Sequence, residues 1–248
     1  MVPLRVLTWN LKHGRSVPPA GRELFGEFAE ALAAWDWEIA LLQEVPPWWP
    51  ALLGSRLGAG SARVLTSRNF GLAVRQAIAV RWPDAIKSNG GGSNAVLVRG
   101  LDLVERRALR LTPVPERRWL LGVRVWGPGS ATGGVWVGNI HASGWPPRAA
   151  AREARRAARA LTSWATAGEP IILGGDFNFE WVSLDGFAWA GGAEVDHVFA
   201  RGLDRLAEPE VLDQGSLSDH PPVLVRLGSP VRHGDRDFPG ARPRPYAN

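Results

Sequence analysis

The sequence predicts a single α/β domain organised around two β-sheets. The chain has 248 residues, a length that single α/β domains commonly reach. Segments with the two-residue period of strands and segments with the period of helices occur along most of the chain, and it has no repeat of solenoid period. Strand-rich stretches lie on both sides of a central group of short strands, which indicates that two sheets pack against each other.

The first half of the chain predicts two strands, a helix between them and a meander. Leu4–Asn10 combines alternating and β-branched residues, which predicts a strand. Between residues 21 and 37, apolar residues recur at helical spacing and predict an amphipathic helix. Glu38–Val45 is predicted as a buried strand that ends before two prolines. From about Ala62 to Val125, short apolar runs separated by glycine or proline predict an antiparallel β meander.

The second half predicts four strands and one long helix. Val135–His141 is a predicted strand, and Arg148–Trp164 is a predicted helix with an apolar stripe and an arginine stripe. Three further strands are predicted at Pro170–Asn178, Glu194–Gly202 and Pro221–Leu227. We therefore predict a folded domain over residues 1–228 and a loosely ordered tail, rich in proline and arginine, over residues 229–248.

The charge composition suits an anionic partner, and the missing pattern of a secretory signal favours an intracellular protein. The formal net charge of +5 comes almost wholly from arginine, since Lys12 and Lys87 are the only lysines, although a GC-rich genome also explains such a balance. The absence of cysteine excludes disulfides and thiolate zinc sites. No apolar run approaches the roughly 20 residues that cross a bilayer, and no secretory signal is visible. We expect a cytoplasmic monomer without stable membrane association.

Polar residues cluster where the predicted strands end. Each has an ordinary structural explanation, such as a turn, an Asx-turn, a helix cap or a loop before a strand. Together, however, they have the composition of a divalent-metal hydrolase, with hard oxygen ligands and a few imidazoles for acid–base chemistry. The set comprises Asn10, Glu44, His141, Asp176, Asn178, Asp196, His197, Asp219 and His220.

The chemistry of these residue types assigns them different tasks. Mg²⁺ prefers carboxylate and carbonyl oxygens, so Glu44, Asp219 and the amide oxygen of Asn10 are the predicted metal ligands. Asp176 and Asn178 lie two residues apart, which places them on one side of an extended chain, where they can position water and donate to phosphate. A carboxylate beside an imidazole fixes its tautomer and raises its pKa, and Asp196 is the predicted partner of His220.

Six short segments, in chain order, resemble the signature motifs of the endonuclease/exonuclease/phosphatase superfamily. They are "TWN", "LLQEV", "NIHASG", "GGDFN", "VDHVF" and "SDHPPV". This metal-dependent group includes pancreatic deoxyribonuclease, apurinic endonucleases, neutral sphingomyelinases and inositol polyphosphate 5-phosphatases. The resemblance runs from Thr8 to Val223. It implies a four-layer α/β sandwich, with two central mixed, mainly antiparallel β-sheets flanked by helices.

The resemblance also implies roles for individual residues. By motif, Asn10, Glu44 and Asp219 resemble metal-site residues, with Mg²⁺ as the implied ion and Mn²⁺ as a substitute. Asp176 and Asn178 resemble the groups that orient or activate water. His141 and His220 resemble the imidazoles that contact phosphate, and Asp196 resembles the carboxylate that orients the second imidazole.

Departures from the motifs narrow the substrate class. Apurinic endonucleases carry an acidic residue where Lys12 stands, a lysine near Pro46, a tyrosine at the place of His141 and an asparagine at the place of Gly144. Abasic-site repair is therefore disfavoured. The 5-phosphatase pattern is also missing, and "NIHASG" resembles the deoxyribonuclease type more closely.

We predict a magnesium-dependent phosphodiesterase, most consistent with a nuclease that acts on DNA or RNA. Arg148 begins the arginine stripe close after His141 and can contact a phosphate backbone, although such a stripe is more often a solvated helix face. The segment Lys87–Asn94 is either a flexible binding loop, in which Asn94 reaches phosphate, or a plain connection. Trp145 can stack on a base or simply pack.

Two alternatives remain at this stage. The first is a phosphatase or phosphodiesterase of a small molecule or a phospholipid headgroup that uses the same site. The second is a binding protein with an inactive site, which the competent residue type at every expected position argues against.

Overall fold

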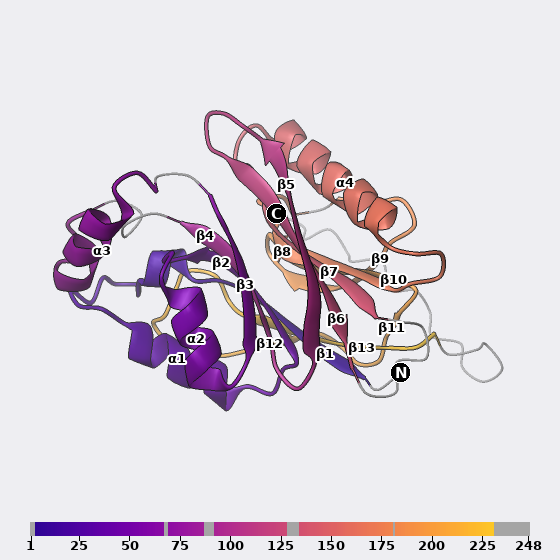
Figure 1. Cartoon of the computed structure of the whole chain (residues 1–248), viewed down its shortest axis with the longest axis horizontal. Helices are drawn as coiled ribbons and strands as arrows, with labels where there is room; N and C mark the ends of the chain where they lie inside the picture. Colours follow the sequence, from indigo (N-terminus) through magenta and orange to yellow (C-terminus); the bar gives the residue numbers. More distant parts are fainter. Residues whose placement is uncertain (1–2, 67–68, 87–91, 128–133, 181, 231–248) are drawn as a thin grey trace, which may run out of the picture.

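The computed structural model describes residues 3–66, 69–86, 92–127, 134–180 and 182–230. Two β-sheets pack face to face, as Figure 1 shows. Helices α1 (Phe25–Ala34) and α2 (Trp49–Leu57) cover the outer face of the first sheet, and α4 (Pro147–Trp164) covers the outer face of the second. This arrangement confirms the four-layer α/β sandwich.

The first sheet contains strands from both ends of the described chain. Its order is β11-β13-β1-β2-β4-β3, and β12 also pairs with β13. Only β1 and β2 are parallel among the described strand pairs of this sheet. The strands are β1 (Leu4–Asn10), β2 (Ile39–Val45), β3 (Gly60–Leu65), β4 (Ser93–Val98), β11 (Asp204–Arg205), β12 (Glu210–Val211) and β13 (Val223–Gly228).

The second sheet is built entirely from the stretch of chain between β4 and β11. Its order is β5-β6-β7-β8-β10-β9, and β7 and β8 are parallel because α4 connects them as a crossover. The strands are β5 (Asp102–Thr112), β6 (Arg118–Trp126), β7 (Val135–His141), β8 (Ile171–Asp176), β9 (Ala188–Ala193) and β10 (Asp196–Arg201).

Successive residues of the central strands enter different hydrophobic cores. In β1, Val6 faces the core between the sheets, whereas Leu7 packs with residues of α1 and α2. In β8, Ile172 faces the core between the sheets and Leu173 packs under α4. Both faces of these strands are buried, which is why they read in the sequence as continuous apolar runs.

The strand directions bring the predicted site residues to one end of the sandwich. In the first sheet, parallel β1 and β2 end side by side, and antiparallel β13 begins beside them, so that Val223 pairs with Thr8. In the second sheet, parallel β7 and β8 end together with His141 opposite Asp176, and antiparallel β10 begins there with Asp196 opposite Asp176. Polar residues distant in sequence therefore meet at these ends.

The predicted meander is wrong in its details. Within the predicted stretch, β3 and β4 pair with each other in the first sheet, whereas β5 and β6 pair with each other in the second sheet. A helix, α3 (Leu72–Arg81), interrupts the predicted strands, and α2 was not predicted at all. Prolines disfavour the interior of a helix, and the prolines between residues 46 and 50 therefore hid α2 in the sequence. Pro50, however, lies in the first turn of α2, where proline is well tolerated.

Other predicted segments agree closely with the structure or fall outside it. The predicted helix over residues 21–37 is shorter, since α1 spans Phe25–Ala34. Strand β8 ends at Asp176, two residues before the predicted end. The glycine-rich residues 87–91 and the tail residues 231–248 lie outside the described residues. None of the described helices is long and apolar enough to cross a membrane.

Buried amides join the two sheets just below the strand ends. The Asn139 side-chain amide of β7 donates to the carbonyl oxygens of Leu42, at 2.9 Å, and Ala95, at 2.8 Å, across the sandwich. Its oxygen accepts a hydrogen bond of 2.8 Å from Gln43 Nε2. Asn139 and Gln43 are fully buried. These bonds fix the position of one sheet relative to the other beneath the site.

Replacement of Asn139 by alanine is therefore expected to lower the free energy of unfolding by about 2–3 kcal/mol, because it leaves buried carbonyl oxygens without donors. Urea denaturation followed by circular dichroism measures the change. Ser163→Ala is the matched control, since the exposed Ser163 hydroxyl donates only within its own helix, to the carbonyl of Ala160. An equal denaturation midpoint for Asn139→Ala and the control would contradict this role.

Candidate active site

Residues of both sheets converge at the end of the sandwich. The first sheet contributes Asn10 and Glu44 at its strand ends and, before β13, Asp219 and His220. The second sheet contributes His141, Asp176 and Asp196 from its strands and Asn178 just after β8. Electrostatic interactions link these groups: Asp176 and Asp219 both affect the pKa of Glu44, and Asp176 affects those of Asp196 and His220. The structure thus brings the predicted catalytic and metal-site residues together.

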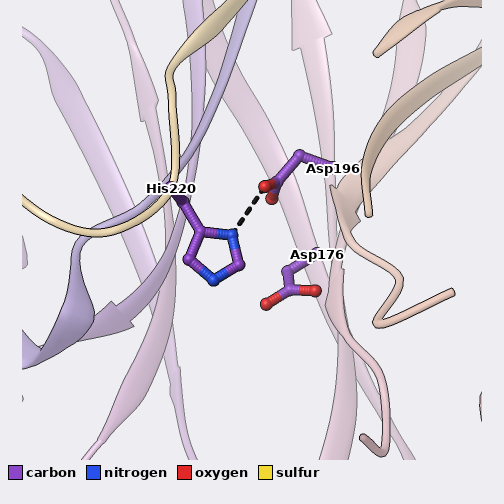
Figure 2. Close-up of side chains that lie close together, drawn as sticks. All are labelled: Asp176, Asp196 and His220. Carbon is purple, nitrogen blue, oxygen red and sulfur yellow. Dashed lines mark hydrogen bonds and ion pairs between the residues drawn. The ribbon is translucent and has the colours of Figure 1, made fainter. Parts of the chain in front are cut away.

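His220 and Asp196 form a partly buried ion pair. Figure 2 shows the His220 ring reaching from the segment before β13 toward Asp196 and Asp176 on the second sheet. Its Nδ1 lies 2.7 Å from Asp196 Oδ2. Burial alone would lower the pKa of His220, but the hydrogen bond to Asp196 and the charges of Asp196 and Asp176 outweigh it and raise the pKa to about 9. The raised pKa favours the imidazolium form of His220, in line with the predicted pairing, while burial raises the pKa of Asp196.

Asp176 lies at the centre of the site. Its Oδ2 accepts a hydrogen bond of 2.8 Å from Asn10 Nδ2 and lies 3.5 Å from His141 Nε2. Its Oδ1 accepts the backbone N–H of Asn178 at 2.8 Å. The carboxylate is thus held from both sheets, and its orientation is fixed.

The relation between Asp176 and Asn178 differs from the prediction. Asn178 has a φ of 50°, so the chain turns there instead of continuing as an extended strand. The bond from the Asn178 N–H to Asp176 forms an Asx-turn, the ordinary structural alternative for this pair. The Asn178 side-chain amide donates to the carbonyl of Ala142 at 3.0 Å. Both residues remain at the site, but the turn places them there, not the two-residue period of a strand.

Glu44 lies between two histidines. Its carboxylate is 3.1 Å from His13 Nε2 and 3.9 Å from His141 Nε2. Burial, and then the negative charge of Asp176, raise the pKa of Glu44 to about 7. Burial lowers the pKa of His141 to about 4, so this ring is neutral at physiological pH. The negative charge of Asp176 therefore opposes ionisation of Glu44, and a bound cation would offset this repulsion.

The donor set suits a hard divalent cation. Ligand atoms of Asp176, Asp196 and His220 all lie within 4.8 Å of one another. His220 and Asp196 already satisfy each other, however, and the second Asp196 oxygen is buried without a hydrogen-bond partner among the described residues. The predicted ligands are engaged differently: Asn10 Oδ1 accepts the N–H of Lys12 at 2.9 Å, and Asp219 pairs with the Lys12 ammonium. Glu44 is therefore the carboxylate best suited to a cation.

The structure adds residues that the sequence did not single out. His13 contacts Glu44 from the short helix η1 (Lys12–Gly14) after β1. Arg118 begins β6 with a largely buried side chain, and its charge lowers the pKa values of Glu44 and His141. Glu153, the buried acid of α4, accepts the N–H of Ser143 at 2.7 Å and its hydroxyl at 2.8 Å. The sequence did hold a signal for Glu153, because it is the one acidic residue in the predicted helix Arg148–Trp164.

Backbone strain is concentrated around the site. Six described residues other than glycine have a positive φ, and five of them lie in the segments that form the site. Such conformations cost about 1–3 kcal/mol each and persist only where the surroundings hold them. Ser218 illustrates this, since its hydroxyl donates to the Asn10 carbonyl at 2.6 Å. The five are Lys12, His13, Glu44, Asn178 and Ser218.

The predicted substrate-binding residues have separate outcomes. Asn94 does not lie in a loop: it belongs to β4, pairs with Val64 and is fully buried, and neither its amide nitrogen nor its oxygen has a hydrogen-bond partner among the described residues. Trp145 follows the site strand β7 and is 80% exposed. Arg148 is exposed in the first turn of α4. His197 points elsewhere, toward the carbonyl of Phe179.

The sequence of this chain is similar to that of one known protein family. The family model of the endonuclease/exonuclease/phosphatase family matches residues 7–220. A search of curated protein sequences found no match.

Solved structures similar to this chain share its fold at low sequence identity. One is a functionally unknown conserved protein from Enterococcus faecalis V583, with a TM-score of 0.70, 16% identity and coverage of 92% of this chain and 100% of the other. Another is an endonuclease/exonuclease/phosphatase from Beutenbergia cavernae, with a TM-score of 0.70, 21% identity and coverage of 92% and 72%. A third is the mannosyl-6-phosphatase Bt3783 from Bacteroides thetaiotaomicron, with a TM-score of 0.64, 18% identity and coverage of 91% and 99%.

Proposed function

The chain belongs to the endonuclease/exonuclease/phosphatase family, and on this premise we propose that it is a divalent-metal-dependent phosphodiester hydrolase that cleaves DNA or RNA. The observation that carries this proposal is that the carboxyl group of Asp176, held by Asn10 and Asn178, lies close to the imidazole of His220, which is held by Asp196. A base and an acid thus face one space from opposite sheets.

Asp176 is the group proposed to position and activate water. Its carboxylate is held on both oxygens by donors from Asn10 and Asn178, so its orientation is set before substrate binds. It accepts a proton as the water oxygen bonds to phosphorus. The bond from phosphorus to the leaving oxygen breaks, the leaving oxygen takes up a proton from solvent, and the products are a phosphomonoester and an alcohol.

His220 and Arg118 are proposed to stabilise the negative charge on the phosphoryl oxygens. The His220 Nδ1 is bonded to Asp196, which leaves the Nε2 proton for a phosphate oxygen. Arg118 is a second permanent cation near Glu44 and His141. The neutral His141 ring can donate or accept a hydrogen bond beside Asp176 without adding charge.

Glu44 is the principal group proposed to hold the cation, with Asn10 and Asp219 beside it. Mg²⁺ or Mn²⁺, when bound there, supplies Lewis-acid stabilisation of the developing phosphoryl charge. Oxygen ligands of this kind match the preference of Mg²⁺. The raised pKa of Glu44 supports this assignment, because a cation restores ionisation of a carboxylate crowded by Asp176.

A substrate screen tests this function. The purified chain is incubated with Mg²⁺ and plasmid, single-stranded DNA, RNA, abasic duplex, inositol phosphates or sphingomyelin, and products are separated. We expect metal-dependent cleavage of nucleic acid, with an affinity that falls steeply as salt is added, because arginine–phosphate contacts release counterions. Asp176→Asn protein, purified in parallel, controls for contaminating nucleases.

The screen also discriminates the alternative. Hydrolysis confined to inositol phosphates or sphingomyelin, with little response to salt, would replace the nuclease assignment by a phosphatase or phosphodiesterase of small molecules or headgroups. Absence of hydrolysis of every substrate with Mg²⁺ and with Mn²⁺ would contradict the proposed function itself.

A further inference from the structure

The backbone holds Lys12 in an unusual conformation at the end of β1. Lys12 has a φ of 46°, in the left-handed region that residues with a side chain rarely adopt. Its N–H donates to Asn10 Oδ1 at 2.9 Å, and the N–H of Gly14 donates to the Leu11 carbonyl at 2.7 Å. These bonds fix the direction in which the Lys12 side chain leaves the turn.

The Lys12 ammonium is directed at Asp219, a predicted metal ligand. It forms an ion pair with Asp219 Oδ2, although the two residues lie at opposite ends of the described chain. Burial opposes ionisation of Asp219, but the hydrogen bond and charge of Lys12 outweigh it and lower the pKa of this carboxyl. Asp219 is thus already neutralised by a cation that belongs to the protein.

Two cations of the protein already pair with carboxylates of the site. Four carboxylates interact there: Glu44, Asp176, Asp196 and Asp219. Lys12 pairs with Asp219, and His220 pairs with Asp196. Neither Lys12 nor His220 pairs with Glu44 or Asp176, so these two carboxylates remain for a divalent ion. A second divalent ion would have to displace Lys12 from Asp219.

We propose that Lys12 is a fixed monovalent cation of the active site, which occupies Asp219 and limits the site to one divalent ion. This inference rests on the proposed function, because it concerns the same cation. It assigns Lys12 a positioning role toward Asp219. Lys12 would then stay with Asp219, and substrate phosphate would meet the bound divalent ion, His220 and Arg118.

Manganese binding to the whole chain tests the proposal without an activity assay. Isothermal titration calorimetry and the electron paramagnetic resonance signal of free Mn²⁺ both count bound ions and give their affinity. The variants are Lys12→Met, which removes the charge at similar length, and Lys12→Arg, which keeps it. Arg22→Met is the matched control, since Arg22 forms an exposed ion pair with Glu27 on the surface. Thermal melts confirm that each variant is folded.

We expect one Mn²⁺ per wild-type chain, and an affinity at least about fivefold higher in Lys12→Met, because removal of a nearby positive charge favours cation binding. Lys12→Arg and Arg22→Met should resemble the wild type. Two ions bound by the wild type, or an unchanged affinity in folded Lys12→Met, would overturn the proposal. The proposed function can fail separately. If the wild type bound one Mn²⁺ and the variants behaved as expected, but no phosphoester were hydrolysed, the proposed function would be wrong and the role of Lys12 would stand.

Discussion

Asp176→Asn and His220→Ala are each expected to lower the turnover number at least about a hundredfold, in line with the loss of general acid–base or electrostatic assistance. Asp176→Asn keeps the shape of the side chain but removes the charge that accepts a proton from water. His220→Ala removes the imidazolium and leaves Asp196 buried without its partner. Steady-state kinetics on the best substrate of the screen measure both effects.

Asp213→Asn is the matched control for Asp176→Asn. Asp213 is exposed and accepts only the N–H of Gly215, so its conversion should leave the turnover number unchanged. Thermal melts show whether His220→Ala is folded, and the isosteric Asp176→Asn variant provides the test if it is not. Near-normal turnover in folded Asp176→Asn would refute the assignment of the base.

Removal of divalent cations is expected to abolish hydrolysis altogether. EDTA competes for a cation held by Glu44 and its neighbours, and Mg²⁺ or Mn²⁺ added in excess should restore the rate. Binding of the cation to the folded state alone should also raise the melting temperature as its concentration rises. A calorimetric scan therefore checks the same site without substrate.

The control for chelation is the variant Glu44→Gln. It lacks the carboxylate proposed as the main ligand, so its melting temperature should respond less to Mg²⁺ than that of the wild type. Hydrolysis that persists after thorough chelation would count against metal dependence. If Mg²⁺ raised the melting temperatures of the wild type and of Glu44→Gln equally, the cation would have to bind to another group.

Much of the fold could be predicted from the sequence because the central strands are buried on both faces. Apolar runs such as Leu4–Asn10 and Val135–His141 have boundaries in the structure that match the prediction. The region before β4 could not be predicted in the same way. Helix α3 has only one fully buried residue, Ala79, so its sequence lacks the apolar stripe that marks a packed helix.

The sequence predicted which residues gather at the site better than it predicted the contacts between them. Polar residues after apolar strands pointed to Asp176 and Asp196, and the pairing of Asp196 with His220 appears in the structure as predicted. The contacts of Lys12 and His13 could not be foreseen, because they depend on left-handed backbone at two residues that are not glycine, although Gly14 follows them. Asn94 was misplaced because a glycine-rich segment precedes it and made its strand look like a loop.

The connectivity of the two sheets has a consequence for how such a protein can diversify. All strands of the second sheet come from one uninterrupted stretch, Asp102–Arg201, inserted between two parts of the first. This inserted stretch therefore carries His141, Asp176, Asn178 and Asp196 and joins the rest of the chain at only two points. Glu44 and His220 belong to the parts of the chain outside it. Recombination at those junctions could exchange the residues proposed to position water and keep Glu44, the residue proposed to hold the cation.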